Sequence, residues 1–130
     1  MKPSLRPRVW ISWLPVLLYA GAIFINSSGP SAVTLPPFPH ADKLAHLAAY
    51  ALMGWLVLRA LVITLNQPPT SRLFLAAALI AALYGASDEL HQGLVPARDS
   101  SLADLAADGL GSVLGAWLFG RVHGKTGGKQ

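Results

Sequence analysis

The chain has 130 residues, of which 53% are hydrophobic and only 12% are charged. Charged residues make up about a quarter of a soluble domain, so this composition excludes an ordinary soluble protein and predicts one membrane-embedded unit. The absence of cysteine excludes disulfides, thiolate metal sites and cysteine nucleophiles. The formal charge of +4 predicts no nucleic-acid partner, because the basic residues stand at the ends of apolar segments rather than on one face.

Four apolar segments, each long enough to cross a bilayer, follow a basic leader at residues 1–8. Their expected bounds are Val9 to Ile25, Asp42 to Leu65, Arg72 to Leu90, and Leu102 to Phe119. The predicted fold class is therefore all-α, an integral membrane bundle of four transmembrane helices over residues 9–119. A cleaved signal peptide is the alternative for the first segment, because Ala20-Gly21-Ala22 resembles a cleavage site.

The segments between and after the expected helices are rich in residues that oppose helix formation. Residues 26–41 contain Pro30, Pro36, Pro37 and Pro39, and are expected to form a linker. A shorter return carries Pro68-Pro69. Residues 120–130 are basic and glycine-rich, and are expected to form a flexible tail.

The distribution of lysine and arginine predicts the orientation of the bundle. Most of these residues lie in the leader, beside the loop between the second and third segments, or in the tail: Lys2, Arg6, Arg8, Arg59, Arg72, Arg121, Lys125 and Lys129. Lys43 and Arg98 fall on the other side. Under the positive-inside rule both termini are therefore cytoplasmic. The ends of the helices near Lys43 and Arg98 then open to the extracytoplasmic side.

The acidic residues of the chain all fall at this predicted extracytoplasmic end: Asp42, Asp88, Glu89, Asp99, Asp104 and Asp108. A charge at the centre of a transmembrane helix costs about 2.5–3.5 kcal/mol, so such residues stay at helix ends or face the bundle interior. Residues four apart share a helix face, which places Asp42, His46 and Tyr50 on one stripe. We therefore expect these side chains to converge, with Asp42 approaching Gln92 of the third segment.

The last segment combines carboxylates with small residues on one face. In order along that face stand Asp104, Asp108, Gly111 and Gly115. Small residues at this spacing let another helix approach closely. Asp104 and Asp108 are therefore expected to point into the bundle and away from lipid.

Four short motifs occur in a fixed order along the chain: Asp42-Lys43-x-x-His46, Asp88-Glu89-x-x-Gln92, Pro96-x-Arg98, and Asp104-x-x-x-Asp108-x-x-Gly111-x-x-x-Gly115. Together with Phe24-Ile25-Asn26-Ser27-Ser28 they resemble the VanZ-like family of small bacterial membrane proteins, named after a protein linked to low-level teicoplanin resistance. The resemblance covers roughly residues 20–118. It implies a multi-pass protein of the bacterial cytoplasmic (inner) membrane and cell envelope, with a link to antibiotic resistance. The sequence departs from the family pattern at Asp108, where many members carry Asn.

Several of these charges also have a purely structural interpretation. Asp42 can cap the second helix and pair with Lys43 at the surface. Asp88 and Glu89 stand near a helix C-terminus, where acids oppose the dipole and need a cation or a metal. Arg98 is the expected cation, and the resulting clamp either staples helices or binds a ligand.

Two further residues near the same end have expected partners. His46, about one turn inside the second segment, is expected to pair with an acidic neighbour. Asp99, which precedes two serines, is expected to cap the last helix.

Three functions are compatible with this set of residues. The first is binding of envelope lipids or lipid-linked cell-wall precursors by Asp42, Lys43, His46, Asp88, Glu89, Gln92, Arg98, Asp104 and Asp108. The second is an intramembrane enzyme acting on a lipid phosphate or ester, with His46, Glu89 and Asp104 as catalytic candidates. Its optional cofactor is a divalent cation, and the side chains expected to hold that cation are His46, Asp88, Glu89, Asp104 and Asp108. The third is an assembly factor whose glycine face docks another membrane protein or a second copy of the chain. No HExxH or GxSxG motif is present.

Overall fold

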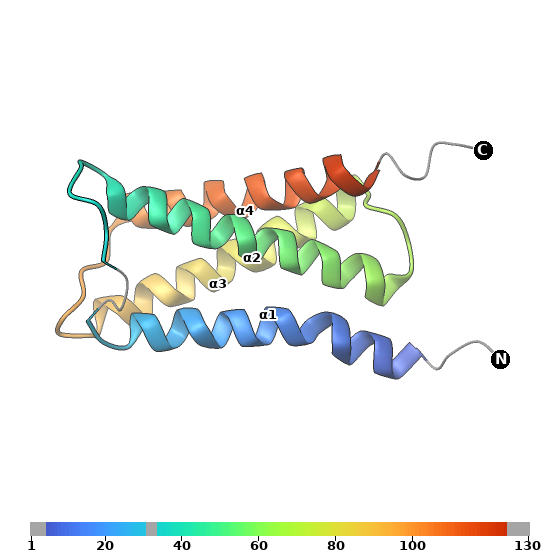
Figure 1. Ribbon diagram of the computed structural model, residues 1–130, viewed down its shortest axis with the longest axis horizontal. Coiled ribbons are helices and arrows are strands. Elements are labelled where there is room, and N and C mark those ends of the chain that lie inside the picture. Colours follow the sequence, from blue (N-terminus) through green and yellow to red (C-terminus); the bar gives the residue numbers. More distant parts are fainter. Residues whose placement is uncertain (1–4, 31–33, 125–130) are drawn as a thin grey trace.

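The computed structural model describes residues 5–30 and 34–124. They form four helices and no strand: α1 (Leu5–Ser27), α2 (Ala41–Leu65), α3 (Ser71–Gly93) and α4 (Leu102–His123) (Figure 1). Each helix is long and apolar enough to cross a membrane. The predicted all-α bundle with four candidate membrane spans is therefore confirmed.

The helices extend beyond the expected bounds at both ends of the chain. α1 begins at Leu5, so its first turn includes residues that were expected to form the leader. α4 continues to His123, so it includes the first residues of the expected tail. The remainder of those two segments, residues 1–4 and 125–130, lies outside the described part of the chain.

Local signals fix the turn between α2 and α3 where the sequence predicts it. Asn66 ends α2 in the left-handed region at φ 51°, a conformation that asparagine tolerates, and its N–H donates to the Val62 carbonyl. The Thr70 side chain then accepts a hydrogen bond from the Leu73 N–H at 3.3 Å and caps α3. Two prolines between these caps prevent α2 and α3 from merging into one helix.

The caps of α2 and α4 differ from those expected. His40 precedes α2 in the left-handed region at φ 63°, and no side chain caps this helix, so Asp42 lies within the first turn instead of capping it. Ser101, rather than Asp99, caps α4 by accepting a hydrogen bond from the Asp104 N–H at 3.0 Å. The cause is position, because Asp99 stands two residues too early to reach the first N–H groups of α4.

Helix α2 lies at the centre of the bundle and contacts the other three helices, most extensively α4. The close approach depends on glycines, because a Cβ at three of them would overlap the backbone of the facing helix: Gly54 faces Ser112, Gly111 faces Leu47, and Gly115 faces Ala51. This α2–α4 seam confirms that the glycine face of α4 packs against a helix. Helix α1 packs against α2 and α3 and does not contact α4.

The outer surface of the bundle is apolar. Large hydrophobic side chains remain exposed along all four helices, among them Leu17 of α1, Leu52 of α2, Leu79 and Leu83 of α3, and Leu110 of α4. Exposed apolar surface of this extent fits hydrocarbon rather than water. The chain is therefore a multi-pass membrane protein.

Neighbouring helices run antiparallel, which sorts the connections between two ends of the bundle. The start of α1, the α2–α3 turn and the end of α4 lie at one end (Figure 1). The α1–α2 and α3–α4 connections lie at the other. The two ends differ in charge, and each contains a cavity.

Candidate binding site

A cavity of about 700 Å³ lies at the end of the bundle where α2 and α4 begin and α3 ends. We call it the polar cavity. Its charged and amide-bearing lining residues are Asn26, Asp42, Lys43, His46, Asp88, Gln92, Arg98, Asp99 and Asp104. Asp42 and Gln92 line the same cavity, in agreement with the expected convergence of the second and third segments. Glu89 and Asp108 do not line it, but both contact His46, which does.

His46 joins three helices through two buried carboxylates. Its Nδ1 atom lies 2.8 Å from Asp108 Oδ1 of α4 and 3.5 Å from Glu89 Oε1 of α3. Asp108 is 0% exposed and Glu89 is 6% exposed. The expectation that His46 pairs with an acidic neighbour is confirmed. We call these three residues the histidine cluster.

Lys43 ties the start of α2 to the start of α4. Its Nζ atom lies 2.5 Å from Asp42 Oδ2 and 3.1 Å from Asp104 Oδ1. The contact with Asp104 is an ion pair by distance but lacks hydrogen-bond geometry. Asp104 is buried, as its position on the glycine face predicts, whereas Asp42 keeps about half of its side chain exposed. The Asp42–Lys43 pair expected from the sequence is therefore present, and it extends to a third residue.

Asp88 is held by hydrogen bonds rather than by a cation. Its Oδ2 atom accepts from the Tyr50 hydroxyl at 3.3 Å and from Gln92 Nε2 at 3.1 Å. Gln92 also donates to the Ser27 hydroxyl at 3.1 Å. This network connects the end of α1 to α2 and α3, and all four side chains are buried.

The Arg98 clamp expected from the sequence is not formed. Within residues 5–30 and 34–124 the structure shows no ion pair between Arg98 and either Asp88 or Glu89. Asp88 is occupied by Tyr50 and Gln92, and the nearest basic group to Glu89 is His46. Arg98 instead lines the polar cavity.

Sequence reasoning gave no role to the residues that seat α1 against the rest of the bundle. The Tyr19 hydroxyl donates to the Ala49 carbonyl at 2.7 Å, and the Tyr84 hydroxyl donates to the Ala20 carbonyl at 2.5 Å. Ser27 is buried and accepts from Gln92. Ser27 stands among polar residues at the end of an apolar segment, and this position in the sequence could have indicated that its hydroxyl forms a hydrogen bond at the end of α1.

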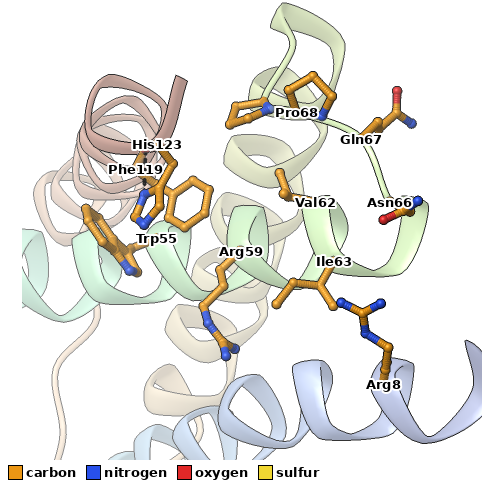
Figure 2. A pocket seen from close by; sticks show the side chains of 11 residues that line it. Arg8, Trp55, Arg59, Val62, Ile63, Asn66, Gln67, Pro68, Phe119 and His123 are labelled. Carbon is orange, nitrogen blue, oxygen red and sulfur yellow. Dashed lines mark hydrogen bonds between the residues drawn. The ribbon is translucent and has the colours of Figure 1, made fainter. Parts of the chain in front are cut away.

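The opposite end of the bundle has the reverse charge. Figure 2 shows a second cavity, of about 690 Å³, into which Arg8 of α1 and Arg59 of α2 project from facing helices. Trp55, Phe119 and His123 form its aromatic side, with the rings of Phe119 and His123 stacked at 4.2 Å. No acidic residue lines this basic cavity. The acidic residues of the described chain therefore lie at one end of the bundle, together with Lys43 and Arg98, whereas Arg8 and Arg59 line the cavity at the other end.

Of the side chains expected to hold a cation, the structure brings three into a compact group. His46, Glu89 and Asp108 each offer a ligand atom, and these atoms lie within 4.8 Å of one another. Asp88 and Asp104 were also candidates, but they point to other partners, Tyr50 and Lys43.

Fold and site together define a small helical membrane protein of four candidate spans with a charged cavity at one end and buried carboxylates behind it. The sequence matches the VanZ/LLP1 family over residues 3–123. Because the match covers nearly the whole chain, the protein belongs to this family, and the resemblance carried by the four motifs is confirmed. Comparison with curated proteins and with solved structures gave no match.

Proposed function

We propose that the protein binds the phosphate-bearing head group of an envelope lipid, or of a lipid-linked cell-wall precursor, in the polar cavity. The proposal places the chain in the bacterial cytoplasmic membrane with this cavity on the extracytoplasmic side, following the lysine and arginine distribution. The observation that supports it best is Arg98, which lines the cavity and has no ion pair among the described residues.

The lining of the polar cavity suits a molecule with a charged head and an apolar chain. One part carries the basic groups of Lys43 and Arg98, while the α1 side contributes Ala22 and Ile23. A volume of about 700 Å³ lies within the range of small-molecule sites. The apolar side of the cavity is formed by α1, which is itself a candidate membrane span, so an acyl or isoprenoid chain would lie against this helix.

The polar groups supply recognition for a phosphate and its neighbours. A guanidinium binds a phosphate through two parallel hydrogen bonds, so Arg98 is the expected anchor. The carboxylates of Asp42 and Asp99 are exposed enough to accept hydrogen bonds from amine or hydroxyl groups of a head group. Gln92 is already committed to Asp88 and Ser27, and holds the cavity wall in place.

Native mass spectrometry of the full chain in detergent tests the proposal, with phosphatidylglycerol and a polyprenyl diphosphate lipid added separately. A charge-assisted hydrogen bond contributes about 1.5–3 kcal/mol. Arg98→Ala should therefore weaken lipid binding by about 10- to 150-fold. Arg72→Ala is the matched control, because Arg72 is an exposed arginine at the opposite end of the bundle.

The two lipids distinguish the sources of the phosphate. Preference for the diphosphate lipid supports a cell-wall precursor, and preference for phosphatidylglycerol supports a membrane phospholipid. The proposal would be contradicted if Arg98→Ala bound each of the two lipids as tightly as the wild type does. In that case the polar end would serve to hold the helices of an assembly factor together.

A further inference from the structure

We propose that His46, Glu89 and Asp108 form a binding site for a divalent transition-metal ion beside the polar cavity. This inference goes beyond the proposed function, because head-group binding by Arg98 requires no metal. It stands on the charges, burial and geometry of the histidine cluster.

The first step is an account of the buried carboxylates at this end of the bundle, which are Asp88, Glu89, Asp104 and Asp108. Asp104 is paired with Lys43. Asp88 accepts hydrogen bonds from Tyr50 and Gln92. Two carboxylates remain, and the side chain that both of them contact is the imidazole of His46.

The two remaining carboxylates lack partners for most of their oxygens. By strict hydrogen-bond geometry neither oxygen of Glu89 has a partner among the described residues, although the Ser101 backbone N–H approaches this carboxylate, and Oδ2 of Asp108 has none either. Burying such a group without a partner is costly, and more so when the group is charged. His46 supplies at most one positive charge against two negative ones. A divalent cation supplies the missing charge and uses the unpartnered oxygens.

The separation of the ligand atoms is compatible with coordination. Metal–ligand distances of roughly 2.0–2.2 Å in a tetrahedral site place neighbouring ligand atoms about 3.3–3.6 Å apart. His46 Nδ1 and Glu89 Oε1 are 3.5 Å apart, and His46 Nδ1 and Asp108 Oδ1 are 2.8 Å apart. The second distance must lengthen by about half an ångström for an ion to fit. All three ligand atoms already lie within 4.8 Å of one another.

The ligand types indicate the kind of ion. One imidazole and two carboxylates suit zinc, manganese or iron(II), whereas calcium and magnesium prefer oxygen ligands alone. Three protein ligands leave at least one coordination position open. Because His46 lines the polar cavity, that position can receive water or a phosphate oxygen from the cavity. The phosphate contact rests on the proposed function, but the metal site does not.

Metal binding is tested on the full chain in detergent, stripped with a chelator and then titrated separately with Zn²⁺ and Mn²⁺. Calorimetry and elemental analysis after desalting measure affinity and stoichiometry. The wild type should bind one of these ions stoichiometrically. Loss of an outer-shell partner alone costs 10- to 100-fold in affinity, so Glu89→Gln and Asp108→Asn should each weaken binding by at least about 100-fold. His91→Asn is the control, because it removes an imidazole, a metal-binding group, at the same end of the bundle that neither lines the polar cavity nor belongs to the histidine cluster.

A second measurement avoids dependence on how well the variants fold. Saturating Zn²⁺ or Mn²⁺ should raise the melting temperature of the wild type and of the control His91→Asn. Absence of stoichiometric binding by the wild type, or Glu89→Gln binding as tightly as the wild type, would overturn the inference. Arg98→Ala should keep its metal affinity. If a variant loses lipid binding but keeps metal binding, the metal site is supported independently of the proposed function. If a variant loses metal binding but keeps lipid binding, the proposed function is supported independently of the metal site.

Discussion

Replacement of Gly115 by alanine tests whether the α2–α4 seam holds the histidine cluster together. A Cβ at Gly115 would lie 2.5 Å from the Ala51 carbonyl carbon and 2.8 Å from the Ala51 Cα, and closer still to the carbonyl oxygen. Non-bonded carbon atoms pack at about 3.5–4.0 Å. The backbones of α2 and α4 must therefore move apart by about 1.5 Å to admit one methyl group, because the carbonyl oxygen is the closest atom.

The energetic cost has two parts. Overpacking of a close helix contact costs about 1–3 kcal/mol. Separation of the same two helices also stretches the 2.8 Å contact between His46 Nδ1 and Asp108 Oδ1, and a hydrogen bond to a charged group contributes about 1.5–3 kcal/mol. We expect Gly115→Ala to lower the free energy of unfolding by about 2.5–6 kcal/mol.

Titration of the protein in mixed micelles with sodium dodecyl sulfate, followed by far-ultraviolet circular dichroism, measures this loss. Gly109→Ala is the matched control on the same helix, because a Cβ there meets nothing within 4 Å. Alanine is a better helix former than glycine by about 1 kcal/mol, so the control should be as stable as the wild type or slightly more stable. If Gly115→Ala and Gly109→Ala unfolded at the same detergent midpoint, the reasoning that the α2–α4 seam holds the histidine cluster together would be refuted.

Three further predictions follow from single contacts. Ser101→Ala and Thr70→Ala each remove a helix cap, so each should lower the free energy of unfolding by about 1 kcal/mol. Ser101 lines the polar cavity and Thr70 does not, so only Ser101→Ala should weaken binding in the lipid-binding assay. Tyr50→Phe removes one of two hydrogen bonds to Asp88 and should cost about 1 kcal/mol in the same detergent titration; an unchanged midpoint would show that this bond contributes nothing. Glu89→Gln and Arg98→Ala should each abolish any change in teicoplanin susceptibility that expression of the wild type produces, with the variants still present in the membrane fraction by immunoblot. If both variants kept the full effect of the wild type on teicoplanin susceptibility, the polar cavity and the histidine cluster would not be a functional site.

The fold and much of the site follow from the sequence because hydrocarbon imposes strong constraints. Helix length, apolar composition and the spacing of small residues are sufficient to predict four spans. The same reasoning predicts that Asp104 and Asp108 face the bundle interior, and both are buried. The pairing of His46 with an acid follows from its depth about one turn inside the second segment, and the acid that it meets is Asp108.

The sequence was less informative about which acid meets which base. That choice depends on the rotation of α3 about its axis and on the path of the connection to α4, and periodicity determines neither. Arg98 therefore lines the cavity instead of clamping Glu89, which lies beside His46. The cap of α4 was predictable, because Ser101 and Asp104 have the spacing of a capping box.

Cysteine labelling in intact cells tests most directly whether the polar cavity opens away from the cytosol. The natural chain has no cysteine, so a single cysteine reports one position without background. Ala97→Cys lies in the connection beside the polar cavity, Gln67→Cys lies in the turn beside the basic cavity, and both positions are exposed. A membrane-impermeant thiol reagent should label Ala97→Cys in intact cells and Gln67→Cys only after permeabilisation. The opposite pattern would contradict the account.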